Sequence, residues 1–90
     1  MQDEVKVKQF KIAVGEVIRE LRETHSDLSL NKFAMAYDFD KGNFSKTERG
    51  LYSLYLITAW RISEALGIKF SDFAKKLEDK LGKDFVLMDE

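Results

Sequence analysis

The sequence predicts a small all-α domain, and three observations lead to this prediction. The chain has 90 residues with no proline and only five glycines. Because these two residues interrupt helices most strongly, such a chain is expected to consist of helices joined by short turns. Apolar residues recur at steps of three and four, which is the helical period. Hydrophobic residues make up 44% of the chain and charged residues 34%, a balance typical of a globular fold.

The first predicted helix runs from about Val7 to a polar turn at 24–27. Its apolar residues stand three and four positions apart with charged residues between them, which indicates one buried face. These residues are Val7, Phe10, Val14, Val17, Ile18 and Leu21. The segment 3–8 also contains an apolar and charged alternation, Val5-Lys-Val-Lys8. A short N-terminal strand is therefore an alternative for these first positions.

Two short helices are predicted next, over 30–36 and 41–48. Ser29 and Asp40 precede them, and both residue types cap helix N-termini by accepting a backbone hydrogen bond. Gly50 supplies a left-handed C-terminal stop. Only three residues separate the two helices, so they are expected to cross at about 90–120° rather than lie antiparallel.

Two longer helices complete the predicted fold. Ser53 is expected to cap a helix that ends at Gly67, and Ser71 to cap one that ends at Gly82. The first should turn six residues inward: Leu56, Ala59, Trp60, Ile62, Ala65 and Leu66. The second carries Phe73, Leu77 and Leu81 at intervals of four. The fold class is thus a compact five-helix domain over 1–80, followed by a tail at 81–90 of unassigned role. The apolar run 85–88 could pack on the domain, pair with the N-terminal stretch or join a subunit interface.

The composition restricts the function. Cysteine is absent and histidine occurs once, so no disulfide, metal site, cofactor or catalytic group is expected, and the chain should not be an enzyme. The net charge of −1 excludes a protein held to nucleic acid by overall positive charge, although it allows a local basic face. Neither a signal peptide nor a membrane span is recognisable. We therefore expect a cytoplasmic protein without membrane contact.

The helix pair at about 29–49 has the residue sizes of a helix-turn-helix. Ala34 is small enough for a crossing helix to approach, and Asp38 stands in the turn, where a left-handed backbone must be tolerated. Phe44 follows six residues later and should point inward among other aromatic rings. These rings are Phe33, Tyr37 and Phe39.

Three runs resemble the Cro/phage-repressor helix-turn-helix family, also called XRE-type. They are Leu28-Ser-Leu-Asn-Lys-Phe-Ala34, Phe39-Asp-Lys-Gly-Asn-Phe-Ser-Lys-Thr-Glu-Arg-Gly50 and Ile62-Ser-Glu-Ala-Leu-Gly-Ile68. The match is without gaps over about 28–73. The resemblance implies a repressor-like transcriptional regulator that binds double-stranded DNA sequence-specifically, often as a homodimer.

The resemblance also assigns residues. It makes 41–48 the recognition helix, which enters the major groove. The implied DNA contacts are Lys41, Gly42, Asn43, Ser45, Lys46, Arg49, Ser29, Asn31, Tyr52 and Ser53. Glu48 is implied to form a structural ion pair with an arginine of the first helix, Arg22 or Arg19. The segment 41–61 is locally basic, with Lys41, Lys46, Arg49 and Arg61 against Glu48.

Four positions depart from the family pattern. Leu30 replaces a glutamine that holds a phosphate, and Asp38 replaces the turn glycine. Gly42 offers no side chain to a base, and Leu54 stands at a frequent proline position. These departures keep a second class open: a repressor fold that binds a protein partner, alone or as an antitoxin. Such a partner would use the face around Leu30, Tyr52 and Tyr55 or the apolar run 85–88.

Overall fold

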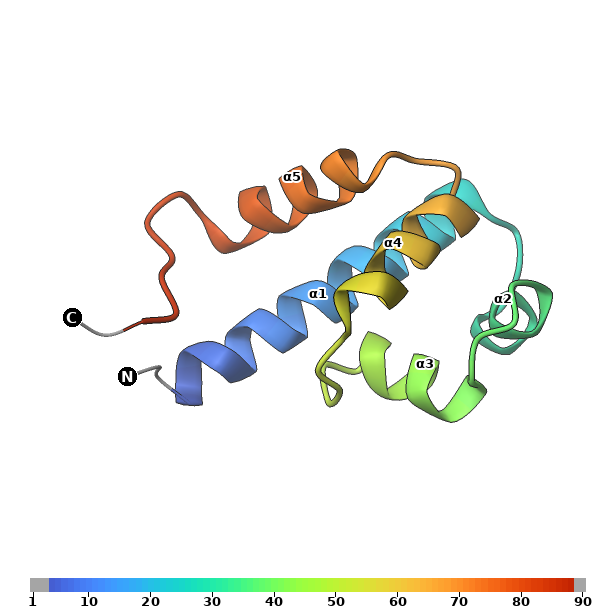
Figure 1. Cartoon of the computed structure of the whole chain (residues 1–90), viewed down its shortest axis with the longest axis horizontal. Helices are drawn as coiled ribbons and strands as arrows, with labels where there is room; N and C mark the ends of the chain where they lie inside the picture. The colour runs from blue at the N-terminus through green and yellow to red at the C-terminus, as the bar shows by residue number, and fades with distance from the viewer. Residues whose placement is uncertain (1–3, 89–90) are drawn as a thin grey trace.

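The computed structural model describes residues 4–88, and this part of the chain folds into five α-helices around one core (Figure 1). Their bounds are α1 Glu4–His25, α2 Leu30–Ala36, α3 Lys41–Glu48, α4 Leu56–Ala65 and α5 Phe70–Leu81. Helix α1 runs through the length of the molecule, with α5 on one side and α3 on the other (Figure 1). The predicted all-α, five-helix architecture is confirmed.

Helix α1 is longer than its apolar pattern indicates. It is continuous from Glu4, so the alternative of a strand over 3–8 is wrong for the described residues 4–8. Its buried face includes Val14, Val17, Ile18 and Leu21, because apolar side chains three and four positions apart share one side of a helix. The alternation of apolar and charged residues at 5–8 therefore lies within the first turns of a helix and does not form a strand.

The predicted capping residues of α2 and α3 are confirmed. The hydroxyl of Ser29 accepts a hydrogen bond from the Lys32 amide at 3.3 Å, and Asp40 Oδ1 accepts one from the Asn43 amide at 2.8 Å. Asp38 adopts a left-handed backbone with φ 61°, as does Gly50 with φ 76°. These positions set the turn between the helices and the stop after α3.

An aromatic cluster holds the helix pair together. Phe33 is fully buried, and three rings surround it with centroids 4.9 to 6.3 Å away: Tyr37, Phe39 and Phe44. These spacings are typical of aromatic side chains in contact. Of the rings expected to surround Phe44, Phe33 and Phe39 contact it, with centroids 5.5 and 5.4 Å away. Tyr37 contacts Phe33 instead and is 44% exposed.

The predicted starts of α4 and α5 are wrong. Helix α4 begins at Leu56 and has no side-chain cap, so Ser53 belongs to the preceding loop. Helix α5 begins at Phe70, one residue before Ser71, and the Lys69 amide donates to Asp72 Oδ2 at 3.3 Å. The first residue of α5, Phe70, packs against the core, so packing there outweighs the local capping preference of Ser71. Leu56, at the start of α4, is largely exposed, so burial does not account for that start.

Helix α4 also departs from the predicted inward set. Ala59, Ile62 and Leu66 are buried, but Leu56 is 71% exposed and Trp60 is 55% exposed. Fewer apolar residues of α4 are therefore buried than the sequence pattern predicts. Apolar residues occupy both the inner and the outer side of its first turns.

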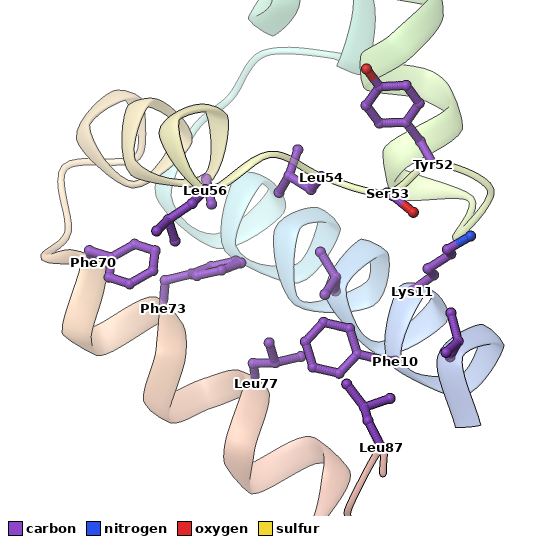
Figure 2. Close-up of a pocket in the computed structure, with 13 residues that line it drawn as sticks. Phe10, Lys11, Tyr52, Ser53, Leu54, Leu56, Phe70, Phe73, Leu77 and Leu87 are labelled. Carbon is purple, nitrogen blue, oxygen red and sulfur yellow. The ribbon is translucent and has the colours of Figure 1, made fainter. Parts of the chain in front are cut away.

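The tail returns to the domain. The Phe85 ring stacks on Phe10 of α1 with centroids 6.3 Å apart, and Leu87 lies beside Phe10 and Leu77 (Figure 2). Phe85 and Leu87 therefore pack on the domain, the first of the three placements considered, while Val86 and Met88 are exposed and 89–90 lie outside the described residues. The tail closes one end of an apolar groove of about 440 Å³ between α1, α5 and the start of α4.

Candidate nucleic-acid interface

Helix α3 presents a polar outer face. Phe44, Thr47 and Glu48 are buried, while the residues between them face outward. The exposed side chains are Lys41, Asn43, Lys46 and Arg49, with Gly42 also exposed and Ser45 half-buried. The predicted contact residues of this helix thus lie on its exposed side, with Ser45 at the edge.

The outer face of α3 is electrostatically positive. Within residues 4–88, the ammonium groups of Lys41 and Lys46 are in no ion pair or hydrogen bond. The acidic residue of the helix, Glu48, is buried on the opposite side. Two free cations with no facing carboxylate on the same helix are suited to an anionic partner.

Glu48 is held by Arg22 of α1 in a two-point ion pair. Arg22 Nε donates to Glu48 Oε2 at 2.8 Å, and Arg22 Nη2 donates to Glu48 Oε1 at 3.0 Å. The hydrogen bond from Arg22 to Glu48, together with the charge of that carboxylate, raises the pKa of the guanidinium. Arg22, rather than Arg19, is the arginine that pairs with Glu48.

The same guanidinium connects a third segment. Arg22 Nη1 donates to the Leu28 carbonyl at 3.1 Å, just before the cap of α2. A bidentate guanidinium pair restricts orientation as well as distance. The ion pair therefore fixes α3 and the entry to α2 relative to α1, and it determines how the outer face of α3 is presented.

Helices α1 and α3 are in close backbone contact at Gly15. A Cβ atom placed there would lie 2.5 Å from the Thr47 carbonyl oxygen and 2.6 Å from that of Glu48. Real Cβ atoms essentially never come this close to another heavy atom. Glycine is therefore required at this crossing, which sequence reasoning did not identify because Gly15 stands inside a regular helical pattern.

The remaining predicted contacts flank α3. Ser29 and Asn31 are exposed at the start of α2, and Ser53 is exposed in the loop between α3 and α4. Tyr52 of that loop is half-buried and lines a small cavity together with Asn43 of α3. The Arg49 side chain lies back along the helix, with Nε donating to the Ser45 carbonyl at 3.4 Å. These residues form a border on two sides of α3.

The structure places two departures from the family pattern, Leu30 and Asp38, and the neighbouring Asp40. Leu30 packs against the hydrophobic core, so this position contributes apolar contacts in place of a phosphate-binding amide. Asp40 uses one carboxylate oxygen as the cap of α3. Asp38 remains exposed in the turn, so its charge lies beside the positive face and opposes an anionic partner.

Arg61 has a role that the sequence did not indicate. Its Nη2 donates to the carbonyls of Tyr37 and Asp38 at 3.4 and 3.3 Å. Its guanidinium carbon lies 4.7 Å from the centroid of the Phe39 ring. The sequence places Arg61 in the basic segment 41–61. In the structure its guanidinium binds the turn between α2 and α3. The contact joins residues 23 and 24 positions apart, so no local pattern predicts it.

We expect Arg61→Ala to lower the free energy of unfolding by about 1–2 kcal/mol, since two hydrogen bonds and an exposed cation–π contact are lost. Urea denaturation followed by circular dichroism checks this value. The matched control is Lys76→Ala on exposed α5, which should change the free energy by less than about 0.5 kcal/mol. Equal stability of Arg61→Ala and wild type would mean that the turn does not depend on this contact.

Residues 4–88 contain neither a membrane-spanning helix nor a metal-binding cluster. No helix there has the length and apolar character needed to cross a membrane. No cluster of three or more metal-binding side chains is present in that part of the chain. The apolar groove beside α1 and α5 also includes Tyr52 and Ser53 of the loop that follows α3 (Figure 2).

Comparisons with known proteins identify the family. No protein-family model matches the chain. A curated relative, control protein C.MunI of Mycoplasma sp, is 32% identical over 72 residues, which cover 80% of this chain and 97% of the relative.

Two solved structures have the same fold. The clp gene regulator ClgR from C. glutamicum aligns with a TM-score of 0.72 and 22% identity, over 81% of this chain and 92% of that one. An HTH_3 family transcriptional regulator from Vibrio cholerae aligns with a TM-score of 0.70 and 28% identity, over 83% of this chain. The alignment spans 42% of the Vibrio protein. Together with the helix pair and the arrangement of α3, these relationships establish that the chain belongs to the Cro/C1-type (XRE) helix-turn-helix family of DNA-binding transcriptional regulators.

Proposed function

We propose that this chain regulates transcription in the cytoplasm, without enzymatic activity, by inserting α3 into the major groove of a specific duplex sequence. The observation that carries the proposal is the pair of free cations on α3, Lys41 and Lys46, on a helix whose acidic residue is neutralised by Arg22. An exposed short helix of this kind fits the width of the major groove. Lysine can donate to guanine O6 and N7 there.

The proposed contacts divide into two groups. Lys41, Asn43 and Lys46 read base edges, because their side chains are exposed on α3 and carry the donors and acceptors that base edges match. Gly42 permits close approach: a Cβ there would meet only Asp40 Oδ1, at 3.3 Å. The other proposed contacts, Ser45 within α3 and the residues that flank this helix, hold the phosphate backbone and set the register. They are Ser29, Asn31, Ser45, Arg49, Tyr52 and Ser53.

Affinity should come from a small number of contacts. The net charge of −1 gives little general attraction to DNA, and Asp38 adds repulsion beside α3. Leu30 contributes no phosphate contact from the start of α2. We therefore propose that the chain binds as a homodimer to a symmetric site, because two copies of an eight-residue recognition helix contact twice as many base pairs.

The test begins with in vitro selection from random duplex DNA, which should enrich a palindromic sequence. On that sequence, Lys41→Ala and Lys46→Ala should each weaken binding by about 1–3 kcal/mol per lost base contact. Fluorescence anisotropy measures the dissociation constants. The unfolding free energy should be unchanged, since both side chains are exposed and unpaired.

Lys76→Ala on α5 is the control, since it removes the same charge from the side of α1 opposite α3 (Figure 1). Binding should also fall with salt, with log K decreasing by about 0.9 per phosphate neutralised. Equal losses for Lys76→Ala and the α3 variants would contradict the assigned face. No enriched sequence, together with salt-insensitive binding to a protein, would favour the protein-partner class.

A further inference from the structure

The apolar groove between α1, α5 and the start of α4 has the size and lining of a small-molecule site. Its volume is about 440 Å³, and its apolar lining includes Val7, Phe10, Phe73, Leu77 and Leu87. Ligand sites in proteins typically have volumes of about 300–1,000 Å³ and are mainly apolar, with a few polar groups that fix the orientation of the ligand. The polar groups of this groove therefore indicate which ligand it would take.

Lys11 supplies the charge of the groove. Among residues 4–88, it is the one charged side chain in the lining, and no carboxylate lines the groove. Lys11 is half-buried, and within the described chain it is in no ion pair or hydrogen bond. A lysine of this kind lays its apolar stem along apolar surface and keeps its ammonium group in water. Figure 2 shows the Lys11 ammonium and the Ser53 hydroxyl at the same end of the groove.

The length of the groove favours a small molecule over a segment of another protein. Val7 and Val14 both line it from α1, and a separation of seven residues in a helix corresponds to about 10 Å. An extended peptide advances about 3.3–3.6 Å per residue, so only about three residues would fit. The tail closes the end beside Phe10, where Phe85 and Leu87 pack. A peptide passing through would need both ends open, whereas a small molecule needs one.

We propose that the apolar groove binds a medium-chain carboxylate, and that this ligand competes with DNA. The aliphatic chain would lie between α1 and α5, and the carboxylate beside Lys11 and Ser53. An ammonium group and a hydroxyl group both donate hydrogen bonds to a carboxylate, and those from a charged donor are the stronger. A neutral hydrocarbon would leave Lys11 unpaired, and a cationic amphiphile would be repelled by it.

The competition follows from the position of the polar end, and it rests on the proposed function. Tyr52 and Ser53 line the groove and are also proposed phosphate contacts. A carboxylate that accepts the Ser53 hydrogen bond occupies this donor, and its negative charge lies where DNA would bring a phosphate. The ligand and DNA should therefore lower each other's affinity by the same factor.

The first test is isothermal titration calorimetry of the full chain with decanoate as the probe. Wild type should bind one decanoate per chain with a dissociation constant below about 1 mM, as the efficiency per atom of known ligands implies. Lys11→Met keeps an apolar stem and removes the charge, so it should raise this constant at least about 10-fold. Lys76→Met is the matched control, since Lys76 is exposed on α5 and does not line the groove.

A second variant tests the apolar part of the site. Leu77→Trp places a larger side chain in the groove and should abolish decanoate binding. Circular dichroism verifies that each variant stays folded. The charge variant Lys11→Met tests the proposal without filling the groove, because Lys11 is half-buried and makes no ion pair.

The competition is measured by fluorescence anisotropy on the selected DNA sequence. Saturating decanoate should raise the DNA dissociation constant of wild type at least about five-fold, the lower end of typical coupling between two sites. The same addition should leave the DNA affinity of Lys11→Met unchanged, because this variant no longer holds the carboxylate.

Four results would overturn the inference. They are the absence of decanoate binding, equal decanoate affinity of wild type and Lys11→Met, several weak sites that survive Leu77→Trp, and an unchanged DNA affinity at saturating decanoate. One decanoate per two chains would mean that a second copy covers the groove, which also contradicts the inference. A chain that binds decanoate through Lys11 but selects no DNA sequence contradicts the proposed function and leaves the ligand site intact.

Discussion

Replacing Arg22 by methionine is expected to lower the free energy of unfolding by about 3–5 kcal/mol, because it leaves the buried Glu48 carboxylate without its partner. The Glu48 side chain is 3% exposed, and its two oxygens accept from Arg22 at 2.8 and 3.0 Å. A small domain has a total stability of only about 5–15 kcal/mol. Urea denaturation followed by circular dichroism should therefore show a variant close to unfolding at 37 °C.

Two comparisons separate this effect from a general loss of charge. The double variant Arg22→Met/Glu48→Leu removes both charges and should recover most of the lost stability, since apolar replacement of a buried pair is often nearly neutral. Lys80→Met breaks the exposed pair with Glu20, whose atoms are 2.7 Å apart, and should cost less than about 1 kcal/mol. If Arg22→Met and Lys80→Met were equally stable, the buried pair would not be holding α3 to α1.

Gly15→Ala is expected to cost about 2–3 kcal/mol, since overpacking at a close contact forces the backbone to move. The added methyl group would meet two carbonyl oxygens of α3, which belong to backbone and cannot rotate away as a side chain could. Alanine favours a helix over glycine by about 1 kcal/mol, so an uncrowded site would show the opposite sign. Thermal and urea unfolding measure the change.

The neighbouring substitution Glu16→Ala is the control for Gly15→Ala. Glu16 is exposed on the same helix, and its replacement should change stability by less than about 0.5 kcal/mol. Because α1 supports α3, Gly15→Ala should also weaken binding to the selected DNA sequence. A stabilised Gly15→Ala protein would show that α1 and α3 are farther apart than their contact at Thr47 indicates.

The sequence predicted the helix-turn-helix most accurately. Ser29, Asp38, Asp40 and Gly50 act through their own backbone or the next turn, so their residue types determine the bounds of α2 and α3. The starts of α4 and α5 were wrong at Ser53 and Ser71, where serines suggested caps. Helix α5 begins at Phe70, which contacts the core and the Trp60 ring, and a local signal contains no information about such contacts.

The candidate interface also has features that the local sequence predicts and features that depend on tertiary packing. The recognition segment 41–48 follows from local sequence and from the family resemblance. Three other features depend on how distant helices pack. They are the contact of Arg61 with the α2–α3 turn, the requirement for Gly15, and the exposure of Leu56 and Trp60. The DNA contacts assigned to individual side chains remain predictions, which the lysine variants test.

By itself, the sequence determined the class of fold, the order of the helices and the bounds of the helix-turn-helix, because helical period, capping residues and glycine stops are properties of neighbouring residues. Only the tertiary structure decided which arginine neutralises Glu48 and which side of α4 is left apolar and exposed. These features join segments that are far apart along the chain. Their energies arise from burial and from charge pairing across helices, and a linear pattern does not record either quantity.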